Sequence, residues 1–199
     1  MKIIIVGGNG TIGKAIAATL KDKHEIIIAG RTSGDYLVDI ADKKSIFNFF
    51  EKVQNFDALV CCAGPAHLAP LQELTDEDFM IGIRGKLLSQ INLVLLGQNF
   101  INKNGSFTLT SGVLAEDFIY QGVAATTADA AINAFVRSSA NELKNDTRIN
   151  VVAPEVLEDS PQLHHYFPGH TPVHIDIVRT AYLKSIFGII NGQIIRAYG

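Results

Sequence analysis

The sequence predicts a single α/β domain in which helices cover both faces of a parallel sheet. Short apolar runs alternate with amphipathic helical stretches along the 199 residues. The runs are apolar throughout, as strands buried on both faces are. Such alternation is typical of a doubly wound sheet with right-handed crossovers. A chain of this length forms one domain and buries a sizeable core.

The first half of the chain contains four of the expected strands. Residues 2–6 form a β-branched run that ends in glycines, and a helix follows over residues 10–20. Residues 25–29 and 36–40 are the second and third strands. Asp42 caps a helix that extends to residue 53, and the fourth strand covers residues 58–62.

The second half adds three strands, three helices and one irregular stretch. Thr75 and Asp78 have capping-box spacing at the start of a helix that extends to about residue 100. Strands follow at 106–110, 149–153 and 193–197, and helices at 126–143 and 175–187. Residues 157–174 show no periodicity, so we expect an excursion over the carboxyl edge of the sheet, where ligands bind.

Composition and charge exclude several classes of protein. The chain is 47% hydrophobic with a net charge of −3, which excludes a disordered chain and gives no basic face for nucleic acid or an anionic membrane. No apolar run approaches the roughly 18 residues of a membrane span, and the apolar N-terminus is too short for a signal peptide. Cys61 and Cys62 are adjacent, so they point to opposite faces of a strand and form no disulfide. We expect a cytoplasmic protein without nucleic-acid or membrane partners.

A glycine-rich turn separates the first strand from the first helix. Its G-x-G-x-x-G pattern consists of Gly8, Asn9, Gly10, Thr11, Ile12 and Gly13, and Gly7 adds an overlapping spacing. The strand–turn–helix context is the one that a dinucleotide-binding, Rossmann-type motif requires. Glycines let backbone N–H groups approach a pyrophosphate, and the helix N-terminus supplies partial positive charge. The alternative is a turn that binds no ligand.

The end of the second strand distinguishes between the two nicotinamide dinucleotides. An NAD site has an Asp or Glu there for the ribose 2′-OH, whereas this chain has Gly30-Arg31-Thr32-Ser33. Arg31 can hold a 2′-phosphate, and Thr32 and Ser33 can donate hydrogen bonds to it. Asp35 is positioned to pair with Arg31 in the free protein, and a purely surface Arg31 is the alternative. NADP(H) is therefore favoured over NAD(H).

The order of these segments resembles the short-chain dehydrogenase/reductase family across nearly the whole chain. Asp39-Ile40 matches the position that contacts the adenine ring in that family, and Cys62-Ala63-Gly64 stands in place of its N-A-G element. Residues 105–111 resemble the strand that carries the family's serine, and residues 149–154, ending in Pro154, resemble the strand before its P-G turn. The resemblance implies an oxidoreductase in which Asp39, Ile40, Cys62, Ala63, Gly64 and Pro154 contact the cofactor.

The family's Tyr-x-x-x-Lys motif is missing. When residues 130–135 are aligned with the family's helix that follows the motif, Ala125 takes the position of the tyrosine and Asp129 that of the lysine. None of the five tyrosines in the chain has a lysine four residues later. Two candidate catalytic residues remain. Ser111 can orient a carbonyl, or it is an ordinary strand-end serine bonded to backbone. Lys86 stands where the family carries an asparagine, and it either faces the cleft near Asp129 or reaches to solvent beside a solvated Asp129.

No metal site is expected, because His164, His165, His170 and His174 lack a recurring carboxylate or cysteine at ligand spacing. Two functions stay open. One is an NADP(H)-dependent oxidoreductase acting on a small, unidentified carbonyl or alcohol substrate with a rearranged catalytic set. The other is a catalytically inactive NADP(H)-binding sensor or regulatory protein. Apolar spacing on the helices at 75–100 and 126–143, which pair across a two-fold axis in the resembling family, predicts a homodimer or homotetramer.

Overall fold

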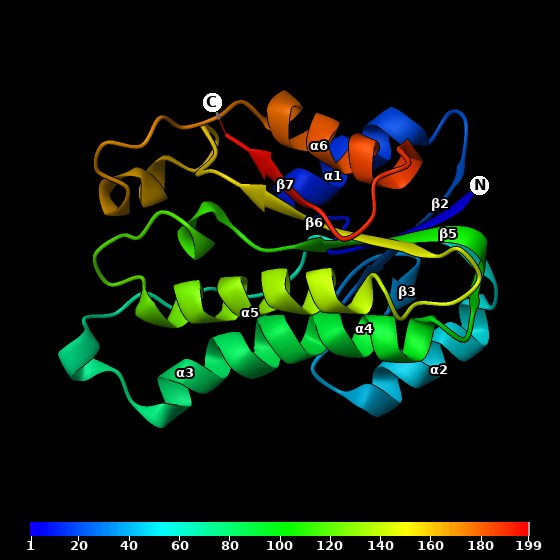
Figure 1. The fold of residues 1–199 in the computed structure, drawn as a ribbon, viewed down its shortest axis with the longest axis horizontal. Coiled ribbons are helices and arrows are strands. Elements are labelled where there is room, and N and C mark those ends of the chain that lie inside the picture. Colours follow the sequence, from blue (N-terminus) through cyan, green and yellow to red (C-terminus); the bar gives the residue numbers. More distant parts are fainter. Residues whose placement is uncertain (199) are drawn as a thin grey trace.

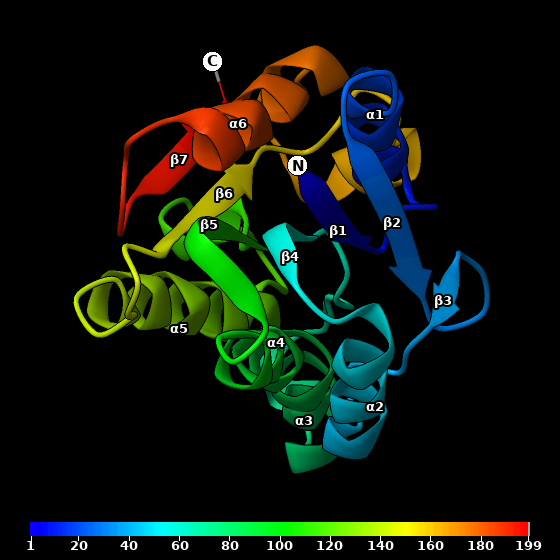
Figure 2. The ribbon, with the colours of Figure 1, turned by 90° about the vertical axis from the view of Figure 1, so that its right-hand side faces the viewer.

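A computed structural model of the chain describes residues 1–198. These residues form a seven-stranded, fully parallel sheet with the strand order β3-β2-β1-β4-β5-β6-β7. Helices α1 and α6 cover one face of the sheet, and α2, α3, α4 and α5 cover the other, which gives three layers (Figures 1 and 2). The doubly wound Rossmann-type fold predicted from the sequence is confirmed.

The elements of the described chain have the following bounds. The strands are β1 (Lys2–Val6), β2 (Glu25–Gly30), β3 (Tyr36–Leu37), β4 (Phe56–Cys61), β5 (Ile101–Thr110), β6 (Arg148–Pro154) and β7 (Ile194–Ala197). The helices are α1 (Thr11–Leu20), α2 (Lys43–Val53), α3 (Asp76–Gly82), α4 (Ser89–Gly97), α5 (Val123–Ser139) and α6 (Ile175–Phe187). Short 3-10 turns lie at η1 (Leu71–Glu73), η3 (Val113–Ala115) and η4 (Pro161–Tyr166), and η2 (Ile83–Leu88) is a π-helical turn.

The two faces of the sheet have separate apolar cores, as strand alternation requires. Ile4 and Val6 of β1 belong to the core under α2, α4 and α5, whereas Ile3 and Ile5 belong to the core under α1 and α6. Cys61 belongs to the core under α2, α4 and α5, whereas Cys62 packs against the core under α1 and α6, and both are free thiols. The prediction that they form no disulfide is confirmed.

Several elements differ from their predicted extents. The strand predicted over residues 106–110 begins five residues earlier, at Ile101, and the bounds of β4, β6 and β7 differ by one or two residues. The strand predicted over residues 36–40 is only Tyr36–Leu37, because this edge strand meets β2 at just two positions. The helix predicted over residues 126–143 begins at Val123 and ends at Ser139. The long helix predicted from Thr75 does begin with a capping box, but the π-turn η2 interrupts it and it ends at Gly97.

By length and composition alone, the helical stretch Asp76–Gly97 is long and apolar enough to cross a membrane. Its mean hydropathy is 1.4 over the most apolar window, although no single apolar run is long. In the fold, Leu93 and Val94 pack into the core of the sheet, and Gln90 is buried and hydrogen-bonded to β5. Of the most apolar window of this stretch, 39% is buried inside the fold.

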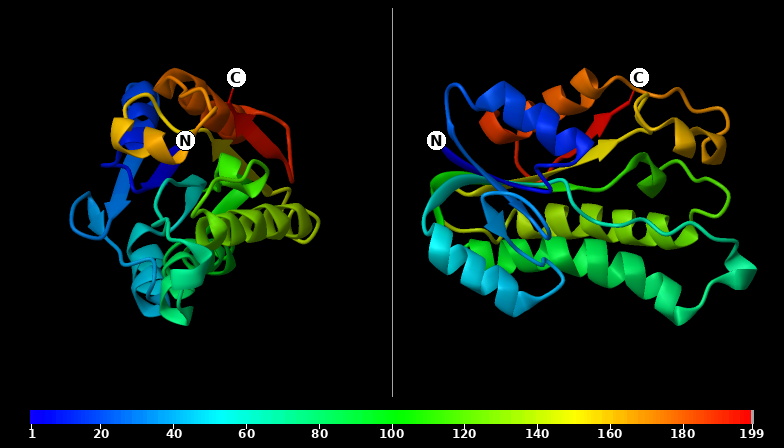
Figure 3. Two further views of the ribbon diagram at one scale, coloured as in Figure 1. Left: turned by 90° about the vertical axis from the view of Figure 1, so that its left-hand side faces the viewer. Right: turned by 180° about the vertical axis from the view of Figure 1, so that it is seen from behind.

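The irregular stretch predicted over residues 157–174 lies on the side of the molecule where the strands have their carboxyl ends (Figures 1 and 3). Leu157 and Val173 form an isolated parallel bridge at its two ends, and the turn η4 lies between them. The excursion therefore begins and ends beside β6, near the loop that follows β5.

Candidate functional site

The turn between β1 and α1 has the close backbone packing that the glycine pattern predicted. Gly7 has φ +79° and its N–H donates to Ala29 O at 2.8 Å. A Cβ at Gly13 would lie 2.4 Å from Gly7 O, so a larger residue requires the backbone to move. Gly10 caps α1 without any side-chain hydrogen bond, which leaves the first N–H groups of the helix available to an anion.

A cavity of about 380 Å³ opens beside this turn, between the ends of β1, β2 and β4. Apolar walls come from Val38, Ile40 and Ala63, and the charged side chains in the lining are Arg31 and Asp39. The remaining lining residues are Val6, Gly7, Gly30, Ala41, Gly64, Pro65 and Gly85. The glycine turn, the apolar walls and the two charged side chains make this cavity a candidate cofactor site.

The loop after β2 is tied to the glycine turn and leaves Arg31 free. Asn9 Nδ2 donates to Ser33 Oγ at 2.8 Å, which joins the two segments beside the cavity. Asp35 does not pair with Arg31, and this expectation was wrong. Its carboxylate instead accepts the N–H of Ile28 at 2.8 Å. Within residues 1–198 the guanidinium of Arg31 has no carboxylate partner, so its charge is available to a ligand.

The predicted cofactor residues fall into three groups. Six of them line the cavity: Gly7, Arg31, Asp39, Ile40, Ala63 and Gly64. Others build the adjoining turn or loop: Gly8, Asn9, Gly10, Thr11, Ile12, Gly13, Thr32 and Ser33. Cys62 packs toward the core under α1 and α6, and Pro154 ends β6 at a distance along the sheet edge. Sequence reasoning missed the six other lining residues, which are Val6, Gly30, Val38, Ala41, Pro65 and Gly85.

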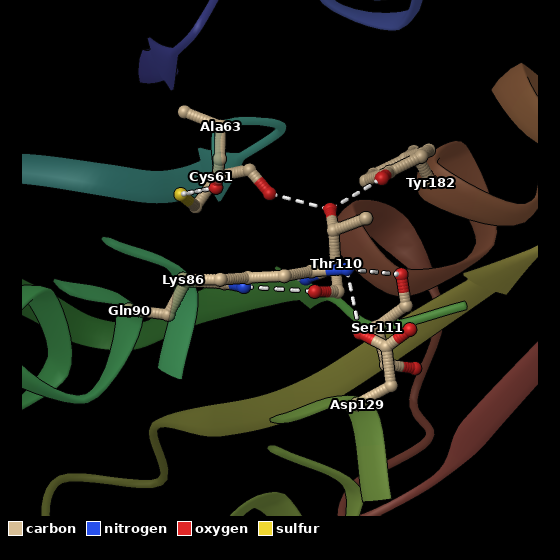
Figure 4. Close-up of polar contacts among 8 residues, drawn as sticks. All are labelled: Cys61, Ala63, Lys86, Gln90, Thr110, Ser111, Asp129 and Tyr182. Atoms are coloured by element: carbon tan, nitrogen blue, oxygen red, sulfur yellow. Dashed lines mark hydrogen bonds and ion pairs between the residues drawn. The ribbon is translucent and has the colours of Figure 1, made fainter. Parts of the chain in front are cut away.

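Lys86 lies in the π-turn η2 and points along the edge of the sheet toward β5 and α5 (Figure 4). Its Nζ is 2.5 Å from Asp129 Oδ1 and 3.2 Å from Ser111 O. The two side chains are 12% and 3% exposed. The hypothesis that Lys86 pairs with Asp129 is confirmed, and the alternative of a solvated pair is wrong. Gly64, at φ +147°, makes room for the lysine, because a Cβ there would lie 2.6 Å from Lys86 Cγ.

The surroundings of Asp129 set its charge. Burial raises the pKa of this carboxyl above its ordinary value, and the ammonium of Lys86 opposes that shift. A Cβ at Gly112 would lie 2.8 Å from Asp129 Oδ2, so the carboxylate packs directly on that backbone. The ion pair therefore lies in a confined site between η2, α5 and the end of β5.

Ser111 is buried beside this pair. Its N–H donates to Val152 O at 3.0 Å, which fixes the backbone, while its hydroxyl is buried with no hydrogen-bond partner. The alternative of a hydroxyl bonded to backbone is therefore wrong. Buried hydroxyls without partners are rare, so this one is free for a ligand that completes the site.

Thr110 anchors the strand that carries Ser111. Gln90 donates to Thr110 O and accepts from Thr110 N, both at 2.8 Å. Thr110 Oγ1 also lies 2.5 Å from Tyr182 OH and from Cys61 O (Figure 4). Burial raises the pKa of Tyr182, whose side chain has no solvent exposure. That phenol is therefore structural and does not replace the missing tyrosine.

An apolar cluster occupies the place of the missing tyrosine. Ala125 is buried with Val113 and Leu114, and Phe167 of the excursion packs against this cluster. The aromatic ring of Phe167 stands edge-on to His170, with ring centroids 5.4 Å apart. The excursion is thus held directly over the position that lacks a hydroxyl.

His170 itself joins three segments at this edge. Its Nδ1 lies 2.9 Å from Glu155 Oε2, just beyond β6, and its Nε2 lies 3.9 Å from Asp117 Oδ2 in the loop after β5. The side chains of His170 and Glu155 are 9% and 7% exposed. The sequence showed these histidines in an irregular stretch but not which carboxylate they meet. No group of three or more metal-type ligands occurs within residues 1–198.

Comparison with known proteins places this site in context. The family model described as enoyl-(acyl carrier protein) reductase, of the short-chain dehydrogenase type, matches residues 9–173. No curated protein matches the sequence.

Solved structures are similar over essentially the whole chain. The protein lin1944 from Listeria innocua is 45% identical, with a TM-score of 0.97 and full coverage of both chains. A small-chain dehydrogenase is 25% identical, with a TM-score of 0.87 over 100% of this chain and 96% of that one. A small-chain dehydrogenase in complex with NADPH has the same fold at 23% identity, with a TM-score of 0.88 over 98% of this chain and 95% of the other.

Proposed function

This chain belongs to the short-chain dehydrogenase/reductase family, and from that premise we propose that it is an NADP(H)-dependent oxidoreductase acting on a small carbonyl or alcohol substrate. The single observation that carries the proposal is the cavity beside the glycine turn, with the unpaired Arg31 at the end of β2. The proposal is supported by a small-chain dehydrogenase of similar fold whose structure is a complex with NADPH.

The residues present fit such a cofactor. The N–H groups at the start of α1 suit the pyrophosphate, and the slot between Val38 and Ala63 suits the adenosine. Arg31 would hold the 2′-phosphate, with Thr32 and Ser33 as further donors. When bound, the reduced nicotinamide supplies a hydride to the carbonyl carbon.

The chain's own groups would then orient and polarise the substrate. The unpartnered hydroxyl of Ser111 can donate to a carbonyl oxygen. Lys86 makes two of the three hydrogen-bond contacts available to an ammonium, so one N–H remains for the cofactor ribose or the substrate. Lys86 thereby supplies, from a different helix, the positive charge that the family's missing lysine supplies.

The experiment that tests this function is a titration with both nicotinamide cofactors. NADPH should bind at least tenfold more tightly than NADH, which is a difference of about 1.4 kcal/mol in binding free energy. Arg31→Ala should remove most of that difference. Lys21→Ala, which removes another exposed cation at the end of α1, should leave both affinities unchanged. Equal affinities in the unmodified protein would contradict the preference.

The second function is a catalytically inactive NADP(H)-binding sensor or regulatory protein. The observation that favours it is Ala125, which is buried in an apolar cluster where the family has its tyrosine. Single-turnover oxidation of NADPH against 4-nitrobenzaldehyde, cyclohexanone and menadione separates the two functions. Tight binding without turnover on any probe supports the sensor, and turnover supports the enzyme.

A further inference from the structure

We propose that His170, oriented by Glu155, is the proton donor that replaces the missing tyrosine. The inference rests on the proposed oxidoreductase function and names the group that completes it. It comes from a histidine–carboxylate pair, with side chains 9% and 7% exposed, that joins the excursion to the end of β6 at the edge of the sheet where ligands bind.

The position of the pair is the first argument. Glu155 immediately follows β6, whose Val152 binds the backbone of Ser111 on the neighbouring strand. His170 reaches Glu155 from the excursion, on the side where the strands have their carboxyl ends (Figure 1). Phe167, which touches the ring of His170, packs against the cluster that contains Ala125. The imidazole therefore lies beside an aromatic ring that packs against the cluster at the position of the missing tyrosine.

The hydrogen bonds of the pair are the second argument. Glu155 Oε1 accepts the N–H of Val156 at 2.8 Å, and its Oε2 lies 2.9 Å from His170 Nδ1. Both carboxylate oxygens are thus occupied, which holds the carboxylate still and fixes the plane of the imidazole. A carboxylate that orients one ring nitrogen leaves the other for chemistry, as in nucleophile–base–carboxylate arrangements.

The free nitrogen is the third argument. Nε2 lies 3.9 Å from Asp117 Oδ2, which is beyond hydrogen-bond reach. The carboxylate of Asp117 is 70% exposed and, at this distance, does not fix a proton on Nε2. That proton remains available to an acceptor on a bound ligand.

The step balances with the groups named. As the carbonyl carbon accepts the hydride, its oxygen gains negative charge and takes the Nε2 proton. The N–H bond of the imidazolium breaks and the O–H bond of the alcohol forms. The imidazole is left neutral and regains a proton from water.

None of the other nearby groups serves this role as well. Lys86 Nζ is engaged by Asp129 Oδ1 at 2.5 Å and by Ser111 O at 3.2 Å. Tyr182, on α6, is fully buried and bonded to Thr110. Tyr198, which packs against the same cluster as Ala125, already donates its hydroxyl to Glu116 Oε2 at 3.0 Å. An imidazole changes its charge near neutral pH, which suits a group that gives and regains a proton in each cycle.

The test compares His170→Gln with a matched control on the same excursion. His165 is exposed and its ring lies against Tyr166 in a tilted arrangement, so His165→Gln changes the same residue type without touching Glu155. NADPH affinity and NADPH oxidation are measured with the three probes 4-nitrobenzaldehyde, cyclohexanone and menadione, over a range of pH. We expect His170→Gln to lower kcat by about 100-fold or more and to abolish the decline of kcat with rising pH, with the NADPH affinity unchanged. The control should behave as the unmodified protein.

Two further measurements separate proton donation from a structural role. Added imidazole should restore part of the activity of His170→Ala, and Glu155→Gln should lower kcat and alter the pH dependence without weakening NADPH binding. An active protein whose His170→Gln variant keeps its kcat and pH profile would overturn this inference alone. A protein that binds NADPH but oxidises it with no probe would overturn the enzymatic function, and this inference with it.

Discussion

Replacing Lys86 with methionine tests the energetics of the buried ion pair. Methionine roughly keeps the volume but removes the ammonium that lies 2.5 Å from Asp129. The carboxylate, 3% exposed, then has no compensating charge, and breaking such a pair costs about 3–5 kcal/mol. For a chain of this size, that loss lowers Tm by about 6–20 °C.

The pH dependence of this loss has a definite sign. Burial raises the pKa of Asp129, so the folded chain holds that proton more tightly than the unfolded chain. A raised pKa contributes stability that is present below the unfolded value of 3.8 and is lost as pH rises through the folded value. Without Lys86 the pKa rises further. The difference between the variant and the unmodified protein should therefore be largest near neutral pH and shrink in acid.

Urea unfolding of both proteins at several pH values measures this difference. The double variant Lys86→Met/Asp129→Leu removes both charges, and we expect it to be more stable than Lys86→Met alone. A loss below about 1 kcal/mol near neutral pH, or a loss that does not change with pH, would refute the reasoning.

Three further predictions concern the anchor of β5, the glycine turn and self-association. Gln90→Leu leaves the buried N–H and C=O of Thr110 without partners, so urea unfolding should show the free energy of unfolding lowered by about 2–5 kcal/mol. A decrease under about 1 kcal/mol would contradict the anchoring role of the Gln90 amide. Gly13→Ala places a Cβ 2.4 Å from Gly7 O, and isothermal titration should show NADPH affinity reduced at least tenfold; unchanged affinity would count against the turn as the pyrophosphate site. Leu95 on α4 is 47% exposed, so Leu95→Asp should convert a homodimer or homotetramer into monomers by light scattering, and a monomeric unmodified protein would exclude that assembly.

The sequence alone determined the fold and the place of the candidate cofactor site. The apolar runs at residues 2–6 and 58–62 are mostly buried on both faces of a parallel sheet, whereas the run at 25–29 is buried mainly at Ile27 and Ala29. This apolar pattern is a local property of the chain. The glycine spacing from Gly7 to Gly13 likewise predicted a tight turn, because both the pattern and its consequence lie within a few residues. Arg31 was placed beside the cavity by its position at the end of a strand.

Tertiary structure alone decided which chemical groups meet. The π-turn around Lys86 has no signal in its apolar spacing, although it sets the direction in which the lysine leaves the helix. Lys86 and Asp129 were candidates for a pair, but only packing across Gly64 and Gly112 brings them to 2.5 Å and keeps them from water. Glu155 and His170 are 15 residues apart on either side of an irregular stretch, and no periodicity relates them. Local patterns specify strands and turns, whereas partners distant in the chain are fixed only when the whole sheet edge is assembled.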